Sequence, residues 1–594
     1  MTKKMHAWSL AALPLAIGLA SFTGSANAAN FNIGPISGQI DSQMSIGASM
    51  STTNADSRFI SVDNGGQATA RTSDDGRQNY KSGDIFSKIF KGSHDVELRY
   101  GDSGAFLRGN YWYDFETKDG SQRFYDISDS GRDPLQKGSG VQLLDAFVYH
   151  NYTIGNNPGN VRLGRQVVSW GEGLFIQNGI NSINPVDVSA FRRPGAEVKE
   201  GLLPVEMLYF SQGLTENLSM EAFYQLKWAP TVVDNCGTFF GADTAAKGCT
   251  DRLIVTGEDS PQGQANPGTY IARSSKDKDA SDDGQFGVAF RYFAPQLGDT
   301  EFGFFFMNYH SRAPLYSNVA GNFLGPVGIG RPDLAEPVYG YEGDMGAAGY
   351  FFEYPEDIRL YGVSFQTDVG GASVAGEISY RPNMPLQINT GDMSRTSLQI
   401  GEDSTHRGLN GLATGTYIQG YERKEFWQAS MSAVHFIDRV MGASRLALIG
   451  EVGANYISGL GTGDGTTKFG RDSLFGQSRM SDGTCFSEGA GRGASWCEND
   501  GYFTDFSWGY RVRASLDYAN VIAGINLSPN VAFSHDVEGY SPNFNEKAKS
   551  VSLGVNADYG NKYNASLSYT NFFDGKYNTL VDRDFAAVSF GVSF

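Results

Sequence analysis

One stretch of the chain, residues 161 to 202, interleaves charged side chains with large apolar ones. Its charged, polar and aromatic members that could do chemistry are Arg165, Trp170, Glu172, Asn184, Asp187, Arg192, Arg193 and Glu197. Acids and bases are nearly balanced, so these groups can pair with one another or bind a polar solute. Exposing the neighbouring Phe175, Ile180 and Phe191 on a surface loop would be costly. We therefore expect residues 171–202 to fold into the interior, where a constriction would select what passes.

Two structural interpretations of the same segment remain beside this one. It could be an inert plug whose arginines and carboxylates brace the surrounding wall, or a compact cap outside it. In each case Asn184 is expected to cap a short helix with Pro185 at its first position. That helix would run toward Arg193 and end at Pro194-Gly195.

A segment that folds into the interior must be enclosed by a wall, here expected to consist of amphipathic β-strands. Charged residues at alternate positions of these strands would point inward from that wall. Six charged residues project inward by this alternation: Arg445, Glu451, Asp505, Arg511, Arg513 and Asp517. Opposed acidic and basic walls orient polar solutes in channels. Pairing across neighbouring strands is the more frequent use of such residues, so we favour wall support over solute contact at each one.

Hydrolytic chemistry finds little support. The chain contains no Gly-x-Ser-x-Gly elbow, although a barrel lipase need not show a local motif. His150 and His435 are the histidines to check first, and a polar role at an interface or in the lumen is the simpler interpretation of both. We expect no enzyme activity, no cofactor and no metal site.

Four cysteines form two local pairs, Cys236 with Cys249 and Cys485 with Cys497, in Gly-, Asp- and Ser-rich stretches. In an oxidising compartment these spacings favour two loop disulfides over the other two connectivities. Zinc is the competing interpretation, but neither pair has a nearby histidine or a short Cys-x-x-Cys spacing.

Four aspartates, Asp277, Asp279, Asp282 and Asp283, could offer carboxylate oxygens to calcium. Their spacing does not complete an EF-hand loop, so a solvated loop is the simpler interpretation.

Both ends of the chain predict export to a membrane. Lys3 and Lys4, a short apolar run and Ala26-Asn27-Ala28 have the layout of a secretory signal peptide over residues 1–28. Residues 586–594 alternate apolar with small or polar residues and finish on Phe594, as a lipid-facing barrel strand does. The terminal aromatic also resembles the signal read by the barrel-assembly machinery. No other segment resembles a membrane helix, so a Gram-negative outer membrane is the expected location.

The whole mature chain, residues 29–594, fits a single all-β domain: a transmembrane antiparallel β-barrel of about 18 strands with the partly helical segment folded into its lumen. The expected strands are 36–51, 94–101, 104–116, 143–153, 160–170, 203–212, 217–229, 284–294, 299–311, 356–368, 371–382, 421–437, 443–458, 503–518, 520–536, 548–559, 562–573 and 583–594. Short connections alternate with long ones, and both cysteine pairs fall in long ones. A 16-strand barrel results if two weaker segments are loop hairpins instead.

Composition agrees with this architecture. The chain has 75 Gly, 30 Tyr and 40 Phe, yet its mean hydropathy is only -0.32, because a barrel needs apolar residues only at every second position. A formal net charge of -18 makes nucleic acid an unexpected partner. Outer-membrane lipid and lipopolysaccharide are the expected surroundings.

Several motifs resemble the proteobacterial family named domain of unknown function 1302, and the similarity spans nearly the whole mature chain. They are Gly164-Arg165-Gln166, Ser169-Trp170-Gly171-Glu172, Ile183-Asn184-Pro185-Val186-Asp187 and Arg192-Arg193-Pro194-Gly195-Ala196-Glu197. The resemblance implies an outer-membrane barrel and supplies no substrate or catalytic residue. It also implies association with a periplasmic lipoprotein-like partner and an inner-membrane RND-type permease.

Three functions follow as hypotheses. The first is a channel or transporter for small amphipathic or hydrophobic compounds, linked to partners across the envelope. The second is a general or structural outer-membrane protein whose loops make surface contacts. The third, an outer-membrane hydrolase, has the least support.

Overall fold

The computed structural model describes residues 29–594 except 69, 242, 250–251, 255–269, 274–275, 322–347, 400–401 and 486–496. The signal peptide expected at residues 1–28 lies outside the described residues. Within them, no helix is both long and apolar enough to cross a membrane.

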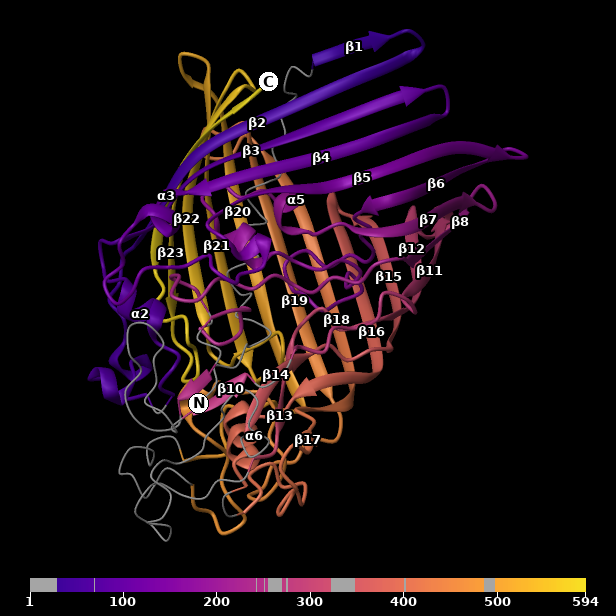
Figure 1. The fold of residues 1–594 in the computed structure, drawn as a ribbon. Helices are drawn as coiled ribbons and strands as arrows, with labels where there is room; N and C mark the ends of the chain where they lie inside the picture. Colours follow the sequence, from indigo (N-terminus) through magenta and orange to yellow (C-terminus); the bar gives the residue numbers. More distant parts are fainter. Residues whose placement is uncertain are drawn as a thin grey trace.

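A closed ring of antiparallel strands forms the body of the molecule (Figure 1). The main sheet has 19 strands, and β1 (Ala29–Ile33) pairs only with β2, so the remaining 18 close the ring. These are β2 (Ile36–Ser51), β3 (Ile85–Tyr100), β4 (Ser103–Asp114), β5 (Ser139–Ile154), β6 (Asn157–Gln166), β7 (Val205–Gly213), β8 (Leu218–Gln225), β11 (Phe286–Ala294), β12 (Thr300–Tyr309), β15 (Ile358–Val369), β16 (Ala372–Gln387), β18 (Tyr421–Asp438), β19 (Arg445–Ile457), β20 (Phe506–Ile522), β21 (Ile525–Glu538), β22 (Lys549–Tyr559), β23 (Tyr563–Phe573) and β24 (Phe585–Ser593).

The predicted barrel is confirmed strand by strand, and the 16-strand alternative is wrong. Closure takes place where expected, between the first and last barrel strands. The backbone N–H of Phe594 donates to Ser42 O at 2.9 Å, and Ser42 N–H donates to Phe594 O at 2.8 Å. The terminal residue therefore belongs to the seam of the ring.

Strand β3 differs most from its prediction, since it begins at Ile85 rather than at residue 94. Its first half reverses the usual pattern: Lys88 is exposed and bonds Glu116, whereas Ile89 is buried. An apolar-out alternation therefore cannot be detected there, although the backbone pairs with β2 and β4.

A belt of apolar side chains covers the outer face of the ring, as the alternation predicts. Large apolar residues remain more than a third exposed in mid-strand, among them Ile46, Leu163, Phe304, Val363, Met431, Val452, Val512, Leu553, Leu567, Val588 and Phe590. On β20 the alternation is clear: Val512 is 44% exposed, whereas its neighbours Arg511 and Arg513 are 5% and 6% exposed. Polar residues thus face the lumen.

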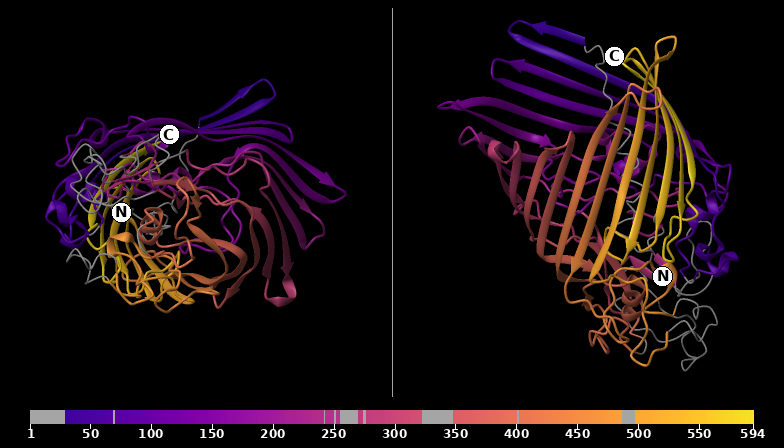
Figure 2. Two further views of the ribbon diagram at one scale, coloured as in Figure 1. Left: turned by 60° about the horizontal axis from the view of Figure 1, so that its bottom comes forward. Right: turned by 180° about the vertical axis from the view of Figure 1, so that it is seen from behind.

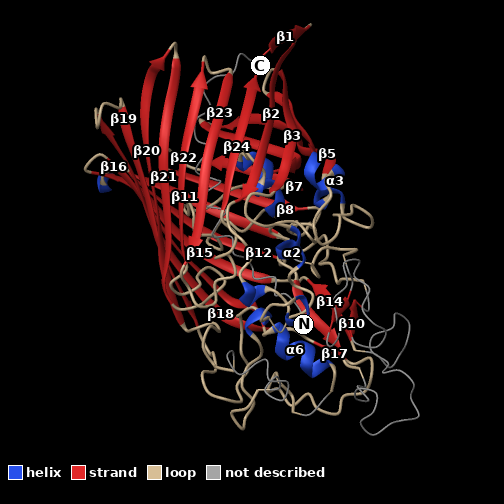
Figure 3. Ribbon diagram, turned by 90° about the vertical axis from the view of Figure 1, so that its left-hand side faces the viewer, coloured by secondary structure: helices blue, strands red, loops and turns tan. Residues whose placement is uncertain are grey.

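Short turns and long connections lie at opposite ends of the barrel (Figures 1 and 3). At the short-turn end, β2 to β6 splay away from the axis that β18 to β22 follow (Figure 2). We refer to the other end as the long-loop end.

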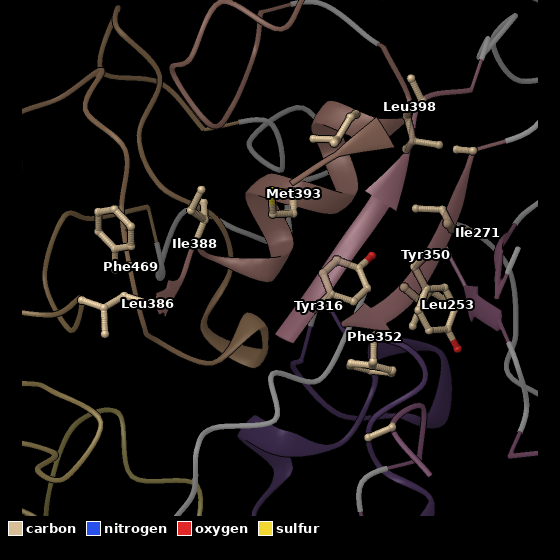
Figure 4. Close-up of a cluster of buried hydrophobic side chains, with 14 of the residues drawn as sticks. Leu253, Ile271, Tyr316, Tyr350, Phe352, Leu386, Ile388, Met393, Leu398 and Phe469 are labelled. Carbon is tan, nitrogen blue, oxygen red and sulfur yellow. The ribbon is translucent and has the colours of Figure 1, made fainter. Parts of the chain in front are cut away.

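The long connections fold together into a cap at that end, with a hydrophobic core of its own (Figure 4). A second sheet contains, in order, β17 (Tyr417–Ile418), β13 (Leu315–Val319), β14 (Gly349–Glu353), β10 (Tyr270–Arg273) and β9 (Arg252–Ile254). Helix α6 (Thr390–Ser397) packs beside β13. The prediction had these segments as loops and did not include this sheet.

The remaining helical elements are short. They are α2 (Asp75–Asn79), α3 (Phe115–Asp119), α4 (Val188–Arg192) and α5 (Val198–Gly201), with 3-10 turns η2 (Ser57–Phe59), η3 (Val62–Asn64), η4 (Pro134–Gln136), η5 (Pro295–Leu297) and η6 (Ser473–Phe475). Of these, α4 and α5 belong to the segment between β6 and β7.

Candidate functional site

Residues 167–204, which we call the plug, connect β6 to β7 through the interior of the barrel. Asn184 holds the two ends of this excursion together. Its side-chain oxygen accepts from Val168 N–H at 3.0 Å, and its amide nitrogen donates to Leu203 O at 2.9 Å. The plug therefore leaves and rejoins the wall at one place and forms a closed loop.

The predicted start of the plug helix is wrong. Asp187, not Asn184, caps α4, and its carboxylate accepts from Ala190 N–H at 3.0 Å and from Ser189 Oγ at 2.7 Å. Asn184 is unavailable as a cap because its amide bridges the ends of the plug. The predicted end is confirmed, since α4 stops at Arg192 before Pro194.

Two carboxylates of the wall hold the plug by its backbone. Glu377 of β16 accepts from the N–H groups of Glu172 (2.6 Å), Gly173 (3.2 Å) and Ile180 (2.9 Å). Glu451 of β19 accepts from Leu174 (3.2 Å), Phe175 (2.5 Å) and Ile176 (2.8 Å). Hydrogen bonds to an ionised carboxylate are about twice as strong as those between neutral groups. These two carboxylates thus hold the plug by its backbone amides, and no basic side chain takes part in these six hydrogen bonds.

Glycine is needed where the plug meets Glu377. A Cβ built on Gly179 would overlap Oε1 of Glu377, whereas one on Gly173 would come no closer than 3.4 Å to any atom. Gly179 is therefore a position of close approach, and Gly173 is not.

Further bonds come from several sides of the lumen. Arg381 of β16 donates to Gly179 O at 2.8 Å, and Gln428 of β18 donates to Gln177 O at 2.8 Å. On β3, Lys91 donates to Gly195 O at 2.8 Å and pairs with Glu200 at 2.7 Å. Because β3 and β16 lie on nearly opposite sides of the ring, the plug spans the lumen.

The predicted plug residues are distributed over this span. Trp170 is 1% exposed and donates to Glu221 of β8 at 2.7 Å. Glu172 lies 3.7 Å from Arg291 of β11. Arg165 lies on β6 itself rather than in the plug.

The basic end of the plug contacts aromatic rings. Arg192 pairs with Asp234 and lies 4.5 Å from the Phe240 ring centroid. The guanidinium carbon of Arg193 lies 4.4 Å from the ring of Trp112. Glu197 pairs with Lys199 at 2.9 Å. Apart from Arg165, the predicted residues Trp170, Glu172, Asn184, Asp187, Arg192, Arg193 and Glu197 make their contacts at separate places along the plug and do not converge on one point.

Five of the six predicted wall residues are buried or half-buried and lie at inward positions, whereas Asp505 is exposed and precedes β20. Arg445 and Asp517 face each other in register and pair at 2.8 Å, while Arg511 pairs with Asp536 of β21 at 2.5 Å. Glu451 faces Arg511 in register but binds the plug amides instead. Sequence reasoning missed Glu377, Arg381 and Lys91. Glu377 could have been found, since it occupies an inward position of the predicted strand 371–382.

A mostly apolar cavity of about 380 Å³ lies between the plug and the cap. The plug contributes Val186 and Phe191, the wall contributes Tyr309, Ile358, Met384 and Leu386, and the cap contributes Leu315, Phe503 and Pro542. The residues that enclose it include two charged side chains, Glu377 and Arg312. Its volume lies in the range of roughly 300–1,000 Å³ typical of small-molecule pockets.

The cysteine prediction is confirmed: Cys236 bonds Cys249 and Cys485 bonds Cys497, with Cα separations of 6.0 and 5.7 Å.

The aspartate cluster and the two histidines show no converging chemistry. Asp277 pairs with Arg273, and Asp282 pairs with Lys227. Among the described residues, no group of three or more His, Cys, Asp or Glu side chains is placed to hold a metal. His150 bonds Ser103 Oγ at 2.9 Å, and His435 bonds Gly371 O at 3.1 Å.

A family model described as "Protein of unknown function (DUF1302)" matches residues 9–594. Curated proteins give no significant match. Among solved structures, the outer membrane channel DcaP of Acinetobacter baumannii is 10% identical with a TM-score of 0.35, covering 95% of this chain and 100% of its own. OccAB1 of the same organism is 10% identical with a TM-score of 0.38, covering 96% and 99%. Scores this low carry no argument about function.

Proposed function

The chain belongs to the family described as protein of unknown function DUF1302, and on that premise we propose that it is an outer-membrane passage for small amphipathic or hydrophobic compounds. The plug closes the barrel, and the cavity beside it holds the cargo. The observation that carries this proposal is the plug itself, held across the lumen by Glu377 and Glu451 next to an apolar cavity.

Placement in a membrane follows from the outer face of the ring. An apolar belt around a closed barrel is costly in water, and closure leaves no strand edge unpaired in lipid. The short turns would face the periplasm and the cap would face outward, as is usual for such barrels.

The anchoring is suited to a plug that moves. Six backbone hydrogen bonds to two side chains can be released without unfolding any strand. We propose that a periplasmic lipoprotein-like partner, with an RND-type permease behind it, triggers this release and accounts for the direction of transport.

Single-channel conductance in planar bilayers tests the proposal. Wild type should stay closed, and replacing residues 173–200 with a short Gly/Ser linker should open stable conductance. The double variant E377Q/E451Q should flicker open, because an amide offers one acceptor oxygen and turns an NH₂ group toward the plug amides. E425Q, on an exposed carboxylate of β18 that does not contact the plug, is the matched control.

Ready conductance in both wild type and the linker variant would contradict closure by the plug. Silence of all variants would favour the surface-contact hypothesis, in which the cap rather than the lumen is the functional part.

A further inference from the structure

Arg312, in the connection from β12 to β13, carries a buried positive charge beside the cavity. It is 8% exposed and is one of the residues that enclose the cavity. Its guanidinium donates to Ala229 O at 3.1 Å, to Ile183 O at 3.0 Å and to the side-chain oxygen of Gln225. All three acceptors are neutral.

No carboxylate of the described chain forms an ion pair with Arg312, and its Nε–H has no hydrogen-bond partner there. Two other buried cations of the lumen do have carboxylate partners: Lys91 pairs with Glu200, and Arg511 pairs with Asp536. Arg381 and Arg513 are also buried without an ion pair among the described residues, but neither of them lines the cavity. A buried charge without a counter-ion is strongly unfavourable. Burial lowers the pKa of Arg312 to about 9, so the group still carries its charge at neutral pH.

The other charge at the cavity does not compensate for Arg312. Both oxygens of Glu377 are engaged by the plug amides of Glu172, Gly173 and Ile180. The remaining walls are mostly apolar. The cavity therefore combines one unneutralised cation with apolar surface, and its volume is that of a small-molecule pocket.

We propose that this cavity binds a small amphipathic monoanion, with its carboxylate at Arg312 and its apolar body against the surrounding side chains. This inference rests on the proposed function and narrows its cargo from amphipathic compounds in general to acids. A neutral compound of the same shape would leave Arg312 without a counter-ion, so the site discriminates by charge.

The test compares 4-phenylbutyrate with its neutral amide, 4-phenylbutyramide, by calorimetric titration of the detergent-solubilised protein. Wild type should bind the acid more tightly than the amide. R312Q should weaken binding of the acid by about tenfold to a hundredfold and leave binding of the amide nearly unchanged. R471Q is the control, since Arg471 is as deeply buried in the cap and donates only to carbonyl oxygens.

The monoanion inference and the proposed transport function are contradicted by different results. Equal binding of acid and amide by wild type overturns the monoanion inference and leaves the cavity as a cargo site. Equal loss of both probes in R312Q also overturns it, since the arginine would then only support the cavity wall. Binding of neither probe, together with silent bilayers, counts against the proposed function itself. The wild-type comparison remains decisive if R312Q does not fold.

Discussion

Single side chains in this protein act mainly by engaging backbone. Glu377 and Glu451 accept plug amides, Arg381 and Lys91 donate to plug carbonyls, and Asn184 joins the two ends of the plug. Apart from Asn184, these contacts do not require particular side chains in the plug. They require the plug backbone to come close, and small residues allow that.

Gly179→Ala tests this requirement. The added methyl group would overlap the Glu377 carboxylate, so Glu377 must shift away from Ile180 N–H and the plug should loosen. We expect bilayer openings at least several-fold more frequent than in wild type. Gly173→Ala is the matched control, because its methyl group meets only ordinary contacts. Equal behaviour of the two variants would show that close approach at Gly179 is unimportant.

Among the elements, the cap has a sheet and a hydrophobic core of its own. Long connections from distant parts of the chain are tied together at the long-loop end. Arg77 of α2 pairs with Asp582, in the connection before β24, at 2.8 Å, and both side chains are at least 96% buried. Breaking a buried pair of this kind costs about 3–5 kcal/mol.

This pair predicts an acid-sensitive contact. Burial opposes the charge of Asp582, but the facing guanidinium groups of Arg77 and Arg583 outweigh it and hold the pKa of Asp582 below its usual value. A lowered pKa stabilises the fold above the unfolded-state pKa, about 3.9, and this contribution is lost as the pH falls through the lower folded pKa.

Hydrogen exchange of residues 52–84 measures the effect. In wild type, protection should stay high at neutral pH and fall as the medium becomes strongly acid. D582N should be poorly protected at neutral pH already and should show little further change with acid. A flat profile in wild type would argue against the pair as the main tie.

At the scale of the whole molecule, the outer face of the ring is matched to lipid. Leu567, near the middle of β23, is 60% exposed and points outward. An arginine at mid-membrane on the lipid face destabilises a barrel by about 2–4 kcal/mol.

We therefore expect L567R to lower the free energy of unfolding in lipid vesicles by about that amount, measured by denaturant titration of tryptophan fluorescence. L567A isolates the smaller loss of apolar surface and should cost less than L567R. Equal costs would indicate that this face does not contact lipid.

Local sequence pattern alone determined the barrel. In most strands apolar and polar side chains alternate along the sequence. The 18 strands, the seam at Phe594 and the inward direction of Glu451 and Arg511 could therefore be predicted without knowledge of contacts. The first half of β3 was missed because Lys88 faces out and Ile89 faces in. The two disulfides were also predictable, because each pair is close in sequence.

Only the tertiary structure decided what holds the plug and what the cavity offers. Glu377 lies about two hundred residues from the amides that it accepts, and Arg312 acquires its neutral surroundings from the plug, the wall and the cap together. Asn184 has the residue type and position of a helix cap, yet its amide bridges Val168 and Leu203 instead. The physical reason is that each barrel strand has one face toward lipid and one toward the lumen, and this difference is recorded in its own residues. The hydrogen-bond partner of a side chain, in contrast, depends on which distant backbone groups the closed ring brings close to it.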